Sequence, residues 1–132
     1  MAYRPVPRVL VVDDYLENAR LLGQLLRLFG FETFLAHDGE SAIARATELV
    51  PDAVLLDLSL PDISGYEVAR RLRAGDTTRN AFIVALTGFT LDAAPHSGAA
   101  SLFDHHLVKP VEPTLLRDLL WSAFTESAAP AG

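Results

Sequence analysis

The carboxylate of Asp57 stands where an aliphatic run breaks, in the stretch AVLLDLSLPD. A carboxylate beside apolar neighbours is costly to bury unless a partner compensates its charge. Two more acids, Asp13 and Asp14, follow a second apolar run, Thr87 ends a third, and Lys109 follows a fourth. These residue types suit the binding of a cation together with an anionic group.

The spacing places these five residues at the ends of predicted strands. The carboxyl ends of parallel strands share one edge of a sheet, and ligands bind outside that edge. Three carboxylates converging there would repel one another in a low dielectric, so the site calls for a cation. The ammonium group of Lys109 can balance only one of them. Oxygen ligands in a chain without cysteine favour Mg²⁺, or Mn²⁺ in its place.

Each of these residues also has an ordinary structural interpretation. Asp14, with Glu17 three residues later, fits an N-terminal capping box in addition to any role at a metal. Taken alone, Asp57 is typical of a strand end, Thr87 of a turn, and Lys109 of a loop that leads into a helix. Their joint placement at the ends of four strands, in this order, favours a shared site.

The elements that must position these residues follow from the apolar pattern. Short aliphatic runs predict five strands, at residues 8–12, 31–36, 53–57, 81–87 and 103–108. Helical spacing of apolar residues predicts four helices, at 15–30, 39–50, 65–75 and 113–124. Strands that alternate with helices indicate an α/β fold, with a doubly wound parallel sheet and helices on both faces.

Two segments carry more specific expectations. A further helix, the fourth that connects two strands, is needed at 91–102. Because Pro95 and Gly98 lie in this segment, we expect a short or mobile helix. The last helix is expected to turn five side chains inward: Leu115, Leu116, Leu119, Leu120 and Phe124. We predict a single domain over residues 1–132, with a core at about 8–126 and short flexible tails.

Composition and charge exclude several classes of function. The chain has 132 residues, 50% of them hydrophobic and 21% charged, as expected of one soluble globular domain. Its net charge of −6 argues against binding to nucleic acid. The absence of cysteine excludes disulfides and thiolate ligands. No apolar run has the length of a membrane span or a signal peptide, so we expect a cytoplasmic protein without membrane contact.

Four pieces of sequence together resemble the receiver domain of two-component response regulators. They are VLVVDD, AVLLDLSLPDISGYEVARRLR, IVALTG and HLVKPV, and the resemblance extends from about Arg8 to Phe124. It is closest in character to the receivers of hybrid histidine kinases and to single-domain response regulators. The resemblance implies a flavodoxin-like (βα)5 fold with strand order 2-1-3-4-5. It also implies a cis peptide bond between Lys109 and Pro110.

The resemblance assigns a role to each residue of the site. Asp57 would take a phosphoryl group from a phosphohistidine of a sensor histidine kinase or phosphotransfer protein, and Lys109 and Thr87 would contact the phosphoryl oxygens. The chain would then catalyse its own phosphorylation and dephosphorylation at Asp57, although it would not be an enzyme in the usual sense. The implied Mg²⁺ ligands are the side chains of Asp13, Asp14 and Asp57 and the backbone carbonyl of Ser59.

Three residues depart from the usual family pattern. Ser59 stands two residues after the acceptor, Phe89 stands two after Thr87, and His106 replaces the aromatic residue three before the lysine. Thr87 and His106 would form the conformational switch; the alternative for His106 is a half-buried polar residue on a weak strand. An unknown downstream protein would bind the face formed by the helix at 91–102, the strand at 103–108 and the last helix.

Two other functions share features with this sequence. A pseudo-receiver would keep the fold as an interaction module without phosphoryl chemistry, but every acid and the lysine are present. An aspartyl phosphatase would carry its nucleophile after the first strand in a DxDx[TV] motif, which VVDDYLE does not match. A phosphoacceptor receiver is therefore the predicted function.

Overall fold

The computed structural model describes residues 6–88 and 102–128, with side chains as far as residue 125. Five strands form one parallel sheet in the order β2-β1-β3-β4-β5. They are β1 (Arg8–Val12), β2 (Glu32–Ala36), β3 (Ala53–Asp57), β4 (Phe82–Thr87) and β5 (His105–Val108). The described helices are α1 (Leu16–Leu28), α2 (Gly39–Leu49), α3 (Gly65–Ala74) and α4 (Pro113–Ala128). The predicted strand order and α/β class are confirmed.

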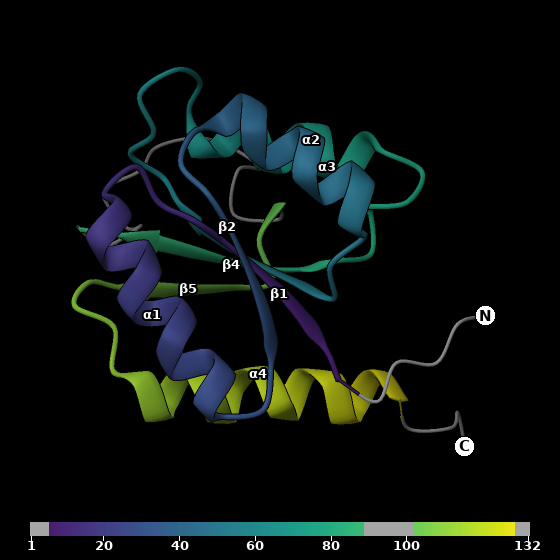
Figure 1. Cartoon of the computed structure of the whole chain (residues 1–132). Helices are drawn as coiled ribbons and strands as arrows, with labels where there is room; N and C mark the ends of the chain where they lie inside the picture. Colours follow the sequence, from purple (N-terminus) through teal and green to yellow (C-terminus); the bar gives the residue numbers. More distant parts are fainter. Residues whose placement is uncertain (1–5, 89–101, 129–132) are drawn as a thin grey trace.

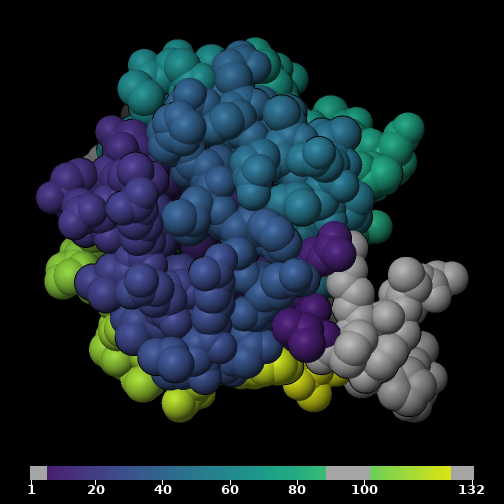
Figure 2. All heavy atoms as spheres, viewed as in Figure 1, coloured from purple at the N-terminus to yellow at the C-terminus, as the bar shows by residue number. Residues whose placement is uncertain are grey.

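The helices cover both faces of the sheet (Figure 1). Successive strand residues point to opposite faces, so Leu10 and Val12 pack toward α2 and α3, whereas Val9 and Val11 pack toward α1 and α4. All five residues of β3 are buried, which explains its continuous apolar run. In the view of Figure 2, α1, β2 and α2 form the face toward the reader.

An aromatic cluster joins the end of α1 to α4. The ring of Trp121 stacks on Phe31 with 4.7 Å between centroids, and Phe124 meets Phe31 edge to face. The indole N–H of Trp121 donates to the carbonyl of Phe29, at 3.3 Å. Gly30, with φ of 104°, makes the left-handed turn that brings the chain from α1 into β2.

The predicted strands and helices agree with the observed ones along most of their length and differ mainly at their ends. The strands at 8–12 and 53–57 have the predicted bounds, while the other three begin one or two residues later than predicted. The strand β5 is short and only partly buried, as expected of the weakest strand. The predicted helix at 91–102 lies almost wholly outside the described residues.

The predicted capping box at Asp14 is wrong. The N-cap residue of α1 is Tyr15, and no side chain caps this helix. The carboxylate of Asp13 instead accepts the backbone N–H of Tyr15, at 2.9 Å, in a tight turn between β1 and α1. This turn delays the helix by one residue, so Asp14 remains exposed and Glu17 lies in the first helical turn.

The predicted inward orientation of Leu115 is also wrong. Leu116 and Leu120 are fully buried, and Leu119 and Phe124 pack beside them, but Leu115 is 55% exposed. Consecutive residues of a helix are separated by about 100° around its axis. The stripe centred on Leu116 and Leu120 therefore leaves Leu115 turned toward solvent.

These two neighbouring leucines provide a matched test of the packing. We expect Leu116→Ala to lower the free energy of unfolding by about 2–5 kcal/mol, because it empties a fully enclosed position. We expect Leu115→Ala to change it by about 0.5 kcal/mol or less. Urea denaturation followed by circular dichroism measures both. Equal losses in the two variants would contradict the orientation of α4.

Candidate functional site

Two acids of the site follow the interior strand β1. Asp13 is buried, and its backbone N–H donates to the carbonyl of Ala36 at 3.0 Å, which continues the pairing of β1 with β2. Its side chain accepts the N–H of Tyr15, whereas the side chain of Asp14 is exposed. The turn therefore presents one enclosed and one open carboxylate.

Asp57 is the last residue of β3 and only 3% exposed. Its Oδ1 accepts the backbone N–H of Ser59 at 2.8 Å. Its Oδ2 accepts a hydrogen bond from the ammonium of Lys109 at 2.7 Å. The charge of this buried carboxylate is thus compensated by one cation and one backbone dipole.

Lys109 enters the site from the far side of the sheet, directly after β5. Its Nζ lies 3.7 Å from Asp13 Oδ2 in addition to its contact with Asp57. Its backbone N–H donates to the Thr87 carbonyl at 2.7 Å, and the predicted cis bond to Pro110 is present. Burial lowers the pKa of Lys109, but the two carboxylates outweigh this effect and raise it, so the ammonium stays charged.

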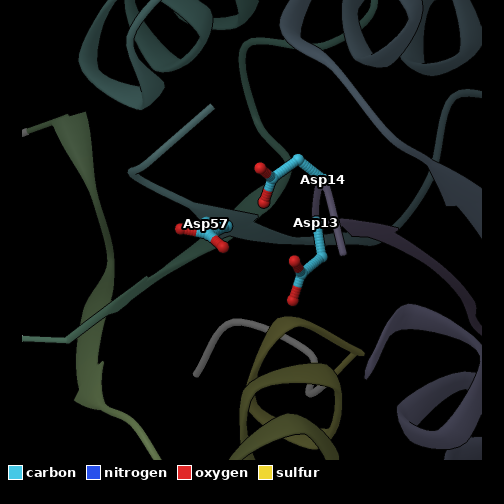
Figure 3. A group of neighbouring side chains, drawn as sticks. All are labelled: Asp13, Asp14 and Asp57. Carbon is cyan, nitrogen blue, oxygen red and sulfur yellow. The ribbon is translucent and has the colours of Figure 1, made fainter. Parts of the chain in front are cut away.

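The three predicted acids come together as one cluster (Figure 3). One carboxylate oxygen of each of Asp13, Asp14 and Asp57 lies within 4.8 Å of the others. Burial is the largest cause that raises the pKa of Asp13, and the neighbouring carboxylates raise it further. The arrangement is short of positive charge, and its hard oxygen donors suit a small divalent cation.

The two predicted switch residues occupy neighbouring strands. Thr87 ends β4, is 1% exposed and pairs with Val108 of β5. His106 is half-buried, pairs with Ala85, and meets the ring of Phe103 edge to face at 5.4 Å. Burial, followed by the nearby His105, lowers its pKa. This agrees with a half-buried polar residue on a weak strand, and the switching role stays a prediction.

One residue beside the site, Asp62, was not predicted from the sequence. The carboxylate of Asp62 accepts the backbone N–H groups of Gly39 and Glu40, at 2.8 and 2.9 Å. These bonds hold the pKa of Asp62 down at about 2. Because its partners lie more than twenty positions away in the chain, neither local spacing nor helix-capping rules indicate this contact.

The chain matches the family described as the response regulator receiver domain over residues 9–120. This chain belongs to that family. The predicted resemblance is therefore confirmed, and the acids, threonine and lysine described above occupy the matched region of this receiver domain.

Individual relatives agree with the assignment. The receiver domain is 40% identical to the virulence sensor protein BvgS of Bordetella pertussis, over 93% of this chain and 10% of BvgS. The response regulator TrrA of Thermotoga maritima, solved in complex with Mg²⁺ and BeF, is 30% identical with a TM-score of 0.78, covering 89% of this chain and 98% of that one. The receiver domain of a Pseudomonas aeruginosa sensor histidine kinase, solved with a magnesium ion in its active site cleft, is 29% identical with a TM-score of 0.80, covering 89% of this chain and 96% of that one.

The chain spans only about a tenth of the length of BvgS. Among the described residues, none of the helices combines the length and apolar character needed to cross a membrane.

The raised pKa of Asp13 has a consequence for stability. A carboxyl group whose pKa is higher in the folded than in the unfolded chain destabilises the fold once both forms are ionised. Asp13→Asn keeps an oxygen for the N–H of Tyr15 but removes the charge. At pH 7 without metal, we therefore expect a melting temperature higher by about 1–4 °C.

Differential scanning calorimetry in the presence of a chelator tests this expectation. Asp14→Asn serves as the control, because that exposed side chain should change the melting temperature little. A fall in the melting temperature of Asp13→Asn would show that the attraction of Asp13 to Lys109 outweighs its burial.

Proposed function

We propose that Asp57 is the phosphoacceptor of this receiver domain and takes its phosphoryl group from a phosphohistidine of a sensor histidine kinase or phosphotransfer protein. The observation that carries the proposal is the setting of its carboxylate. It is buried at the end of a central strand, bonded to the Lys109 ammonium at 2.7 Å, and flanked by two further acids.

The reaction needs a nucleophile that is active at neutral pH without a general base. An ionised carboxylate meets this requirement. An oxygen of Asp57 forms a bond to phosphorus as the bond between phosphorus and the histidine nitrogen breaks. The electron pair of that bond stays on the imidazole, which takes up a proton from solvent. The product is an acyl phosphate on Asp57 and a free histidine on the donor.

The side chains around Asp57 can stabilise the charge that develops on the phosphoryl oxygens. Phosphoryl transfer depends mainly on positioning and on charge neutralisation. Lys109 already contacts Asp57 and supplies a cation beside it. We assign Thr87 as a hydroxyl donor to a phosphoryl oxygen, because it ends the strand that pairs with β3 next to Asp57.

We further propose Mg²⁺ as the cation of the acidic cluster. The side chains of Asp13, Asp14 and Asp57 and the backbone carbonyl of Ser59 would hold it, since oxygen donors of this kind suit Mg²⁺. When bound, the metal would neutralise charge on the phosphoryl group. The magnesium-containing structures of TrrA and the Pseudomonas aeruginosa receiver support this choice.

The proposed output is a change in a protein-binding face, with no part for nucleic acid or membrane. Thr87 would move toward the phosphoryl group, and His106 would turn toward the space that it leaves. The rest of that face includes residues 89–101, Phe89 among them, which lie outside the residues that the structure describes. A cytoplasmic location is proposed because a kinase phosphorylates its histidine with ATP, a cytoplasmic substrate. No observation favours the pseudo-receiver, and the acids and the lysine that a phosphoacceptor would use lie close together.

A small-molecule phosphodonor tests the acceptor directly. Incubation with acetyl phosphate and Mg²⁺ should add one phosphoryl group, seen by intact mass, and Asp57→Asn should add none. Asp76→Asn is the control, because its exposed carboxylate lies outside the site and its loss should leave labelling unchanged. Full labelling of Asp57→Asn would refute the assignment.

Metal binding is tested through stability. Because Mg²⁺ relieves repulsion among the three carboxylates, it should bind the folded chain and raise its melting temperature. At ten times the dissociation constant, the expected gain in unfolding free energy is about 1.4 kcal/mol. Asp13→Asn should lose most of this gain. An unchanged melting temperature of the wild-type protein in millimolar Mg²⁺ would count against the site.

A further inference from the structure

The loop that follows Asp57 is fastened to a helix from another part of the chain. This β3–α3 loop, residues 58–64, contains Asp62, whose two carboxylate oxygens accept the N–H groups of Gly39 and Glu40 at the start of α2. The next N–H, that of Ser41, is taken by the helix's own N-cap, Asp38, at 2.7 Å. The free backbone N–H groups in the first turn of α2 are thus bonded partly by the local cap, Asp38, and partly by the distant Asp62.

Packing reinforces the hydrogen bonds. A methyl group added to Gly39 would lie 2.3 Å from Cγ1 of Ile63 and 2.9 Å from Cγ2 of Val68. Ile63, the residue after Asp62, therefore sits directly on the start of α2, where only glycine leaves room. The carboxylate of Asp62 also lies at the positive end of the helix dipole, which favours its ionised form.

The other end of the same loop is held by β4 and by the side chain of Asp57 at the end of β3. The N–H of Leu58 donates to the carbonyl of Leu86 at 3.0 Å, and the N–H of Ser59 donates to Asp57 Oδ1. A methyl group on Gly65 would lie 2.7 Å from the Cα of Leu58, so the start of α3 closes tightly on this end. Ser59 belongs to this end of the loop and lies three residues before Asp62, which holds the other end.

We propose that Asp62 is a positioning residue: by binding the N-terminus of α2, it holds the β3–α3 loop so that the backbone of Ser59 stays in place against Asp57. The backbone N–H of Ser59 then orients the carboxylate of Asp57. The backbone carbonyl of Ser59 stays where it could bind the cation. The part concerning the cation rests on the proposed function. The part concerning the loop does not.

The first test needs no metal. We expect Asp62→Ala to speed hydrogen exchange of the Ser59 and Gly65 amides about 3–10-fold in the metal-free protein, because the loop loses one of its two attachments. Asp62→Asn keeps one strong acceptor oxygen and should give a smaller increase. Gly39→Ala attacks the same contact from the helix side and should act in the same direction as Asp62→Ala.

Asp38→Ala is the matched control. It also removes one carboxylate, one negative charge and one cap of α2, but Asp38 bonds to Ser41 and not to the loop. It should lower stability without speeding exchange at Ser59. The proposal is overturned if Asp62→Ala leaves Ser59 exchange unchanged, or if Asp38→Ala speeds it equally.

The second test measures the dissociation constant of Mg²⁺ by amide chemical shifts. We expect an increase of about 3–10-fold in Asp62→Ala and little change in Asp38→Ala. With saturating Mg²⁺, labelling of Asp62→Ala by acetyl phosphate should return to the wild-type extent. If the wild-type protein binds Mg²⁺ and Asp62→Ala binds it equally well, the positioning role is refuted. If the wild-type protein binds no Mg²⁺, the proposed metal site fails, and the exchange experiment alone decides the role of Asp62.

Discussion

Compensation of buried negative charge governs the arrangement of this molecule. Three carboxylates lie within 4.8 Å of one another, and the ammonium of Lys109 is bonded to one of them and close to a second. The strand order places β1 beside β3, which brings the acids together, while Lys109 arrives from β5 at the sheet's edge. One lysine leaves a deficit of positive charge, and this deficit makes the site receptive to a cation and then to an anionic group.

The sequence predicted which residues come together at this edge of the sheet, because the signals for their placement are local. Continuous apolar runs such as 53–57 mark buried strands, and the polar residue that ends each run falls at the same edge of a parallel sheet. The strand bounds were less accurate because an apolar residue need not belong to the ladder. Phe31 and Phe103, for example, are buried in the core but precede the paired residues of their strands.

The sequence failed where the deciding contact is distant or depends on a small rotation. Nothing near Asp62 indicates that its partners belong to α2, and nothing near Asp14 shows that Asp13 takes the N–H of Tyr15 and so delays the helix. Leu115 has the right residue type for a buried face but the wrong angle around α4. Such contacts are settled by how the elements pack, which an amphipathic pattern alone specifies only to within one helical position.

The stacking of Trp121 on Phe31 gives this domain a built-in optical reporter. Trp121 is the chain's single tryptophan, and it lies against the carboxyl end of α1, whereas the acids precede the amino end of that helix. A helix of this length separates the two ends by about 20 Å. Intrinsic fluorescence should therefore report the separation of α4 from the carboxyl end of α1, and stay unchanged when a cation binds the three carboxylates. The fluorescence of Trp121 would then report the packing of α4 independently of metal binding at the acidic cluster.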